Sequence, residues 1–202
     1  MRLRPLLVLA VFVSLLSLPT LAHADEAAVA RDNRIAVQLA PATLCFCQYG
    51  TDSHWGVDAL TFVGRAGYAR TIVPHFQLGI DLTVLRSYGG LVTFVSPQAM
   101  ARGYITLLRG DLELGATVRA GYLYGRLDAG NTTSGGAVGF NGTQYGFALD
   151  VLGWVDSSVA LSLTIEAISG NAKQSTHEYI SYFQKEIGPA ALATFAGVHF
   201  GF

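Results

Sequence analysis

The chain has 202 residues and a formal net charge of −1, and 51% of its residues are hydrophobic whereas only 13% are charged. Soluble domains usually carry about 25% charged residues, so this composition makes a poor water-soluble surface. The near-neutral charge also excludes a broad basic surface for nucleic acid. No phosphate-binding loop and no cofactor motif occurs in the sequence. We therefore expect neither nucleic acid nor a cofactor to bind.

The N-terminal segment has the pattern of an export signal. Two arginines give it a basic start, an uncharged apolar stretch covers residues 6–18, and Ala22-His23-Ala24 places small residues where a signal peptidase reads them. The apolar stretch is shorter than the roughly 20 residues that a membrane-spanning helix needs. We expect residues 1–24 to be a cleaved signal peptide and residues 25–202 to form a single domain.

The mature part has no apolar run long enough for a spanning helix, but apolar residues repeatedly alternate with polar or small ones. From Phe76 to Val84, every even position is large and apolar and every odd position is polar or small. A period of two indicates a strand with two different faces. The same alternation, in chain order, marks eight segments: 35–39, 60–68, 76–84, 99–108, 112–122, 144–151, 161–167 and 192–202.

The predicted connections are alternately long and short. The long ones cover residues 44–56, 87–98, 127–142 and 169–188, and the short ones cover 70–75, 109–111 and 155–158. Transmembrane barrels combine long extracellular loops with short periplasmic turns, and an even number of strands brings both termini to one side. The pattern predicts an all-β fold, an eight-stranded antiparallel transmembrane β-barrel with up-and-down order.

Alternation alone does not say which face of the strands lies outside, because a soluble lipocalin-type barrel would turn its apolar face inward around a ligand. The polar face of this chain is rich in small residues and sparse in charge, which suits a crowded interior better than a soluble exterior. Aromatic residues near the predicted strand ends fit the two interfacial girdles of a membrane barrel. We assign Tyr68, Phe76, Trp154, Tyr122, Tyr124 and Tyr145 to these girdles.

The last segment, Phe195 to Phe202, has apolar residues at alternate positions and ends on an aromatic residue. It looks like the C-terminal signal that the outer-membrane assembly machinery recognises, with Gly197, Val198, Phe200 and Phe202 as its residues. With the export signal and the strand pattern, the mature chain resembles the small eight-stranded outer-membrane proteins of the OmpA-barrel and OmpX type. This resemblance implies a location in the Gram-negative outer membrane, with the assembly machinery and membrane lipids, including lipopolysaccharide, as partners.

The predicted inner face carries charged residues of both signs on neighbouring strands. An eight-stranded barrel is just wide enough for its own side chains to fill it, and a buried charge without a partner costs several kcal/mol. We therefore expect an interior ion-pair network that plugs the barrel, and a narrow pore for small solutes or ions as the alternative. The residues of this network are Arg65, Asp81, Arg102, Glu113, Arg119, Asp150 and Glu166.

The predicted loops offer candidates for catalysis. A lipid A or phospholipid acyl hydrolase needs a serine, a histidine and an acid near the extracellular rim. The loops provide Asp52, Ser53, His54, Ser175, His177 and Glu178. The His-x-Ser-Asn motif of lipid A deacylases is absent from the sequence. We therefore expect no enzyme, with hydrolysis as a second alternative.

The expected role is structural, or surface interaction through the extracellular loops. The last long loop carries Tyr179, Tyr182 and Phe183, side chains that suit either a partner outside the cell or the lipid headgroups at the rim. The two cysteines, Cys45 and Cys47, are only two residues apart. An unusual disulfide or unpaired loop residues are both favoured over a metal site, which two thiols would leave incomplete.

Overall fold

The computed structural model describes residues 31–40, 43–48, 55–58, 61–87, 92–128, 137–174, 186–187 and 190–202. The predicted signal peptide, residues 1–24, lies outside these ranges, as do the candidate catalytic residues of the loops. No helix among the described residues is long and apolar enough to cross a membrane.

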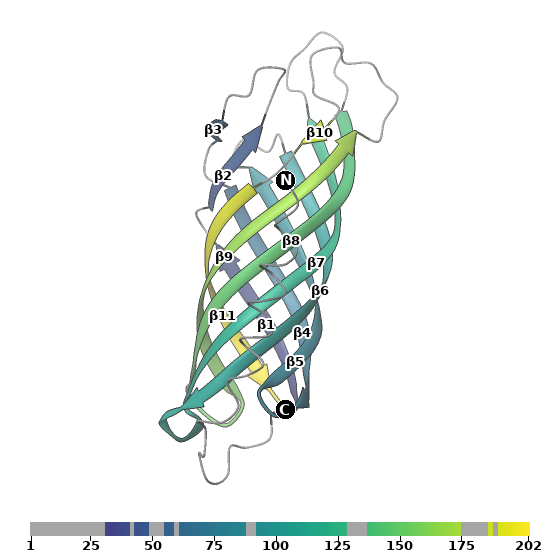
Figure 1. Cartoon of the computed structure of the whole chain (residues 1–202). Coiled ribbons are helices and arrows are strands. Elements are labelled where there is room, and N and C mark those ends of the chain that lie inside the picture. Colours follow the sequence, from purple (N-terminus) through teal and green to yellow (C-terminus); the bar gives the residue numbers. More distant parts are fainter. Residues whose placement is uncertain are drawn as a thin grey trace, which may run out of the picture.

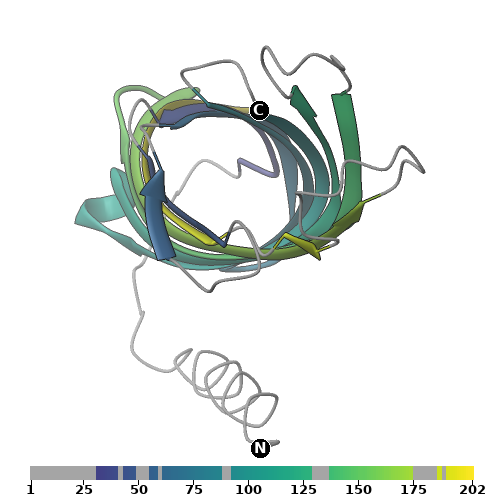
Figure 2. The same ribbon diagram turned by 90° about the horizontal axis from the view of Figure 1, so that it is seen from above.

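Eight antiparallel strands form the barrel wall, and each pairs with the next in chain order (Figure 1). Strand β11 pairs with both β9 and β1, which closes the sheet into the ring that Figure 2 shows from above. The predicted up-and-down antiparallel barrel is therefore confirmed. The eight strands are β1 (Asn33–Ala40), β4 (Thr61–Val73), β5 (Phe76–Ser87), β6 (Val92–Leu107), β7 (Leu112–Asp128), β8 (Ala137–Trp154), β9 (Val159–Gln174) and β11 (Ala190–Gly201).

Two short strands extend the first hairpin beyond the wall. Strand β2 (Thr43–Gln48) pairs with β11 and with β3 (Trp55–Asp58). In the backbone ladder, Cys45 of β2 is paired with Asp58 of β3, and Ala40 of β1 is paired with Val63 of β4. The two pairs have the same register, so β2 and β3 continue the hairpin of β1 and β4. The predicted loop 44–56 is thus too long, and both cysteines lie in a strand, because backbone pairing with β11 continues where side-chain alternation ends.

The other long connections are also shorter than predicted. Strand β6 begins at Val92, β8 begins at Ala137, and β9 continues to Gln174, where β10 (Glu186–Ile187) pairs with it. Backbone hydrogen bonds extend these ladders through glycine and polar residues that break the alternation in the sequence. The strands therefore reach beyond the part of the wall that the pattern marks.

The opposite end of the barrel has tight turns. Strands β4 and β5 are joined by residues 74–75, and the 3-10 turn η1 (Leu108–Gly110) lies between β6 and β7. Residues 155–158 join β8 to β9, as predicted. Because short turns are periplasmic in such barrels, this end, which also holds the C-terminus in Figure 1, is the periplasmic end.

Apolar side chains cover the outside of the barrel, and polar ones fill the inside. Ile80 is 67% exposed and Leu161 is 57% exposed, whereas Gln77 and Glu166 are 1% and 0% exposed. A soluble lipocalin would have the opposite arrangement. An apolar outer wall on a closed barrel, in which every strand finds its backbone partners, is the arrangement that a bilayer requires.

The prediction of an interfacial girdle position is wrong for one residue, Trp154. Tyr122, Tyr124 and Tyr145 are exposed on the outer wall, as expected of an interfacial girdle. Trp154, in contrast, is 8% exposed and its indole Nε1–H donates a hydrogen bond to Glu113 Oε1 at 2.8 Å. The reason is its place on β8, where it shares the inward parity of Asp150.

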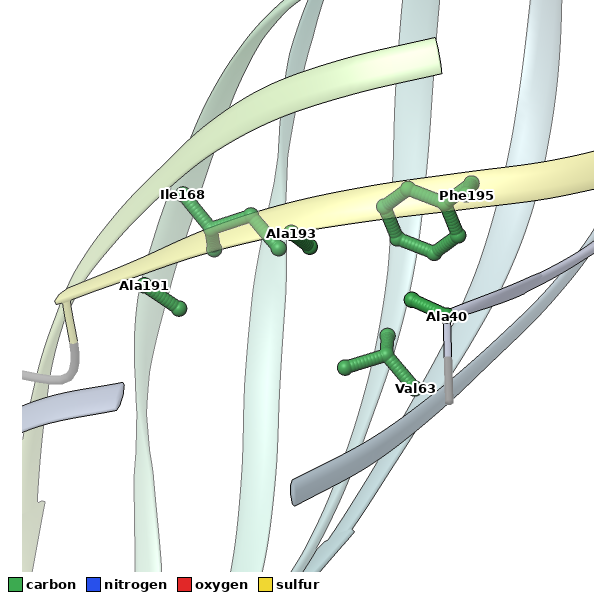
Figure 3. Close-up of a cluster of buried hydrophobic side chains, with 6 residues drawn as sticks. All are labelled: Ala40, Val63, Ile168, Ala191, Ala193 and Phe195. Carbon is green, nitrogen blue, oxygen red and sulfur yellow. The ribbon is translucent and has the colours of Figure 1, made fainter. Parts of the chain in front are cut away.

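The inside of the extracellular half holds apolar side chains as well as polar ones such as Ser96, Gln98 and Gln144. Six of the apolar side chains pack together, and we call them the apolar cluster (Figure 3): Ala40, Val63, Ile168, Ala191, Ala193 and Phe195. Its side chains come from β1, β4, β9 and β11. The barrel interior therefore has an apolar region next to the extracellular end and a charged region below it.

Candidate functional site

The charged region of the interior is the candidate site. Strand parity turns all seven charged residues predicted for it toward the inside, and each is at most 8% exposed. They come from β4, β5, β6, β7, β8 and β9, so the site spans most of the wall. Their side chains, together with Arg34 of β1, make two groups of ion pairs at different heights.

The periplasmic ion cluster consists of Arg34, Arg102, Glu113 and Asp150. Arg34 binds Glu113 with two parallel contacts, Nη1 to Oε2 at 2.7 Å and Nη2 to Oε1 at 2.8 Å. Arg102 bridges the two acids, with Nη1 at 3.1 Å from Glu113 Oε2 and Nη2 at 2.5 Å from Asp150 Oδ2. Planar two-point contacts of this kind are the strong ones between guanidinium and carboxylate.

The central ion cluster consists of Arg65, Asp81, Arg119 and Glu166. Arg119 Nε lies 2.6 Å from Asp81 Oδ2, and Arg119 Nη1 lies 3.0 Å from Glu166 Oε2. Arg65 Nη1 binds the same Glu166 oxygen at 2.6 Å, and Arg65 Nε donates to Thr83 Oγ1 at 3.1 Å. Each cluster thus joins four strands across the barrel.

Inward glycines make room for these side chains. A Cβ on Gly115 would lie 2.6 Å from both Arg102 Nη2 and Asp150 Oδ2. A Cβ on Gly67 would collide with the Asp81 carboxylate, and one on Gly146 would collide with Glu166 Oε1. The interior is filled so closely that the wall facing the ion pairs has no space for a methyl group at these positions.

Sequence reasoning missed Arg34, because the first predicted strand began one residue later, at position 35. With Arg34, the two clusters together contain four arginines and four carboxylates, so their formal charges cancel. Two signals were present in the sequence. Arg34 has the inward parity of Gln38, and the seven predicted residues carried one unmatched negative charge.

A small cavity separates the two clusters. Its volume is about 40 Å³, and Asp81 and Arg119 line it from one side and Arg34 and Arg102 from the other. A cavity of this size has space for one or two water molecules. His199 also lines it, and its Nε2 lies 3.0 Å from Ser162 Oγ.

The residues predicted for assembly lie in the C-terminal strand β11, except Phe202, which directly follows it. Phe200 and Phe202 are 45% and 63% exposed, whereas Gly197 lies against Gln38, where a Cβ would be 2.6 Å from Gln38 Cγ. Val198 pairs with Val37 of β1 and with Leu161 of β9. Their role as an assembly signal stays a prediction. Within the part of the chain that the structure describes, no three histidine, cysteine or acidic side chains group as metal ligands would.

No family model matches the chain, and no curated protein matches it in sequence. Solved structures do match. Neisserial surface protein A is similar over 84% of this chain and 97% of its own length, with a TM-score of 0.60 and 14% identity. The outer membrane protein OprG from Pseudomonas aeruginosa is similar over 85% of this chain and 96% of its own, with a TM-score of 0.51 and 7% identity. At these identities the likeness shows the fold, and with the apolar outer wall it identifies the chain as a small eight-stranded β-barrel of the outer membrane.

Proposed function

We propose that this protein is a closed outer-membrane barrel whose plugged interior makes a rigid scaffold for its extracellular loops. The observation that supports this most is the pair of ion clusters across the interior. All eight charged residues are buried, with Arg119 the most exposed at 8%. Removing one partner from a buried ion pair costs about 3–5 kcal/mol, so a path through both clusters would require several such losses.

The test is conductance of the mature protein, refolded in detergent micelles and inserted into a planar bilayer. Heat-modifiable migration on a gel would first establish that the barrel has folded. The proposal predicts a folded barrel without discrete channel steps. Stable steps from wild-type protein would contradict it and would make the barrel a pore.

A narrow pore is the second candidate, and the cavity between the clusters favours it. This cavity of about 40 Å³ lies inside the barrel, with Gln77 and His199 among its lining residues. A path from this cavity to both ends would require the ion pairs and the apolar cluster to move aside. If the barrel does conduct, substituting Arg119 with Gln should change ion selectivity, since Arg119 lines the cavity and pairs with two acids.

We propose a role without catalysis, although the barrel fold by itself does not decide this. Ser162 and His199 form a serine–histidine contact of 3.0 Å among the described residues. That contact lies inside the barrel, near the periplasmic turn 155–158, where a lipid of the outer leaflet has no access. A deacylation assay with lipid A and phospholipid tests the proposal, and acyl release that is lost in Ser53→Ala or Ser175→Ala would contradict it.

The surface role would belong to the extracellular loops. The aromatic residues Tyr179, Tyr182 and Phe183 support it, because aromatic side chains contribute strongly to binding surfaces. A triple alanine variant at these positions should keep the heat-modifiable barrel and lose binding to a cell-surface partner. Retained binding by the triple variant would exclude this loop as the interaction site.

A further inference from the structure

A row of rings and guanidinium groups crosses the inside of the barrel near its periplasmic end. The rings of His75 and Tyr104 lie edge to face, with their centroids 5.6 Å apart. The Arg34 guanidinium carbon lies 5.2 Å from the centroid of the Tyr104 ring and 5.1 Å from that of the Trp154 ring. Because a cation is attracted to an aromatic face, these contacts connect the turn after β4 with β6, β1 and β8.

The row ends at Arg31, two residues before β1. Its guanidinium carbon lies 3.6 Å from the centroid of the Trp154 ring, closer than Arg34 lies to either ring. The Nε of Arg31 donates to Ser157 O at 3.0 Å, and its Nη2 lies 3.5 Å from Asp156 O, both in the turn between β8 and β9. Arg31 therefore covers Trp154 and joins the start of β1 to that turn.

Trp154 connects Arg31 with the periplasmic ion cluster. Arg31 lies over its ring, and its indole Nε1–H donates to Glu113 Oε1 at 2.8 Å. Trp154, Arg34 and Glu113 are buried, whereas Arg31 is half-buried. Arg31 is thus the outermost of these four side chains, and water from the periplasm reaches it before it reaches the other three.

The two arginines at the start of the first strand are held in different ways. Arg34 binds the Glu113 carboxylate with two parallel contacts and belongs to both ladders of β1. Among the residues that the structure describes, Arg31 makes no ion pair, and the ladders of β1 begin after it, at Asn33 and Arg34. Hydrogen bonds from an accessible side chain compete with water and contribute little net stability. The Arg31 side chain can therefore leave the Trp154 ring without breaking a ladder pair or an ion pair.

A glycine at the end of the last strand makes room for this contact. A Cβ on Gly201 of β11 would lie 2.9 Å from Trp154 Cη2 and 3.2 Å from Arg31 Cγ. The backbone N–H of Gly201 donates to Ser158 O at 2.7 Å, which fixes the end of β11 against the turn that binds Arg31. Any side chain at position 201 would therefore push Arg31 or Trp154 aside.

We propose that Arg31 is a reversible latch on the periplasmic mouth of the barrel. In the closed state its guanidinium lies on the Trp154 ring and is bound to the turn between β8 and β9. In the open state the side chain extends into the periplasm, and Trp154 and the ion pair of Arg34 and Glu113 become accessible to water. The inference rests on the proposed closed barrel and deepens it, because it names the contact that seals the periplasmic side.

Quenching of Trp154 fluorescence by acrylamide tests the latch. The chain has two tryptophans, so in a Trp55→Phe background the tryptophan emission of the refolded mature protein comes from Trp154 alone. With Arg31 in place, only a small fraction of this emission should be accessible to acrylamide. Arg31→Gln should raise the open population about fivefold, since one cation–ring contact is lost, and should shift the emission to the red. Arg109→Gln is the control, because Arg109 is an exposed arginine of the periplasmic turn η1, and it should change neither readout.

A second variant displaces the latch without changing any charge. Gly201→Ala should also increase the accessible fraction of Trp154 emission, whereas Gly153→Ala should not, since a Cβ on Gly153 meets nothing within 4 Å. Unchanged accessibility in both Arg31→Gln and Gly201→Ala would overturn the proposal. So would a folded Trp55→Phe protein whose Trp154 is quenched as readily as in urea, because its latch would then be open.

Heat-modifiable migration verifies that each variant has folded. The quenching readout does not depend on conductance. Channel steps from the wild type would therefore contradict the closed barrel, whereas only the comparison of Trp154 accessibility decides the latch.

Discussion

On β9, the inward side chains are polar at Ser162, Thr164 and Glu166 but apolar at Ile168 and Ala172, although all five share one face of one strand. The interior likewise has a charged region and, closer to the extracellular end, the apolar cluster. In the charged region each charged side chain depends on a partner of opposite charge. In the apolar cluster each side chain depends on close packing against its apolar neighbours. Strand parity therefore decides which side chains are inside, but the chemistry of the interior changes along the barrel axis.

The two regions meet at Phe195. Its side chain is fully buried and belongs to the apolar cluster, and the Arg65 guanidinium carbon lies 4.5 Å from the centroid of its ring. A cation over an aromatic ring is attracted to the ring face. The boundary thus consists of a residue that packs with apolar neighbours on one side and with a cation on the other.

The largest expected effect comes from breaking the charged region. Glu113→Ala leaves Arg34 without its acid and removes the acceptor of Trp154 Nε1–H. We expect the free energy of unfolding to fall by roughly 3–5 kcal/mol, the cost of leaving a buried charge unpaired. Urea unfolding in lipid vesicles, followed by tryptophan fluorescence, measures this. Asp111→Ala, which removes an exposed acid two residues away, is the control, and an equal loss in both variants would contradict the prediction.

A smaller effect should follow from overfilling the charged region. Gly115→Val places a side chain where a Cβ alone would lie 2.6 Å from Arg102 Nη2 and Asp150 Oδ2. We expect a loss of roughly 1–3 kcal/mol, as for other overpacked interiors. Gly103→Val is the matched control, since a Cβ on Gly103 meets nothing within 4 Å. If both variants unfold at the same urea concentration, the ion pairs do not depend on the glycine.

The apolar cluster should tolerate a conservative change better. Ile168→Val removes one buried methyl group and should cost roughly 0.5–1.5 kcal/mol. Ile165→Val removes the same group from a side chain that is 54% exposed on the outer wall, so its effect in a bilayer should be smaller. The same urea titration compares them. A larger loss of unfolding free energy for Ile165→Val would contradict the prediction. It would mean that a methyl group on the outer wall contributes more stability than the buried methyl group of Ile168.

The smallest effect concerns the periplasmic turn between β8 and β9. The backbone N–H groups of Ser158 and Val159 donate to Asp156 Oδ1 at 2.6 and 2.8 Å, and these bonds hold the pKa of the Asp156 carboxyl below its ordinary value of 3.8. A lowered folded pKa adds stability above the unfolded pKa, and this is lost as the pH falls through the folded value. Asp156→Asn should therefore lower the urea midpoint at pH 7 and have less effect at pH 3. A difference in urea midpoint between wild type and Asp156→Asn that is larger at pH 3 than at pH 7 would contradict the prediction.

Much of the fold could be predicted because alternation is a local property. The parity of Phe76 to Val84 alone separates lipid-facing from inward residues, and the tight turn at 155–158 follows from the end of one alternation and the start of the next. Strand ends could not be predicted as well. The pairing of β2 with β11 depends on backbone hydrogen bonds between residues far apart in sequence.

The site could be predicted in composition but not in arrangement. Parity put Asp81 and Arg119 on the inner face, but only the stagger of the strands brings Arg119 to Asp81 and Glu166 rather than to other acids. The apolar cluster was missed because an inward alanine or valine looks, in sequence, like part of the lipid-facing pattern. The prediction for Trp154 failed in the opposite way. An aromatic residue near a strand end was assigned to the membrane interface, but its side chain is buried inside the barrel.

The most direct test of a charge-balanced interior is a double-mutant cycle on Arg34 and Glu113, with each residue replaced by Gln singly and together. Each single variant leaves an unmatched buried charge, whereas the double variant restores neutrality and leaves Arg102 paired with Asp150. We predict that the double variant is less destabilised than the sum of the singles, with a coupling free energy of about 2 kcal/mol. Additive losses in the unfolding free energy would contradict the account, because they would mean that the two side chains stabilise the barrel independently.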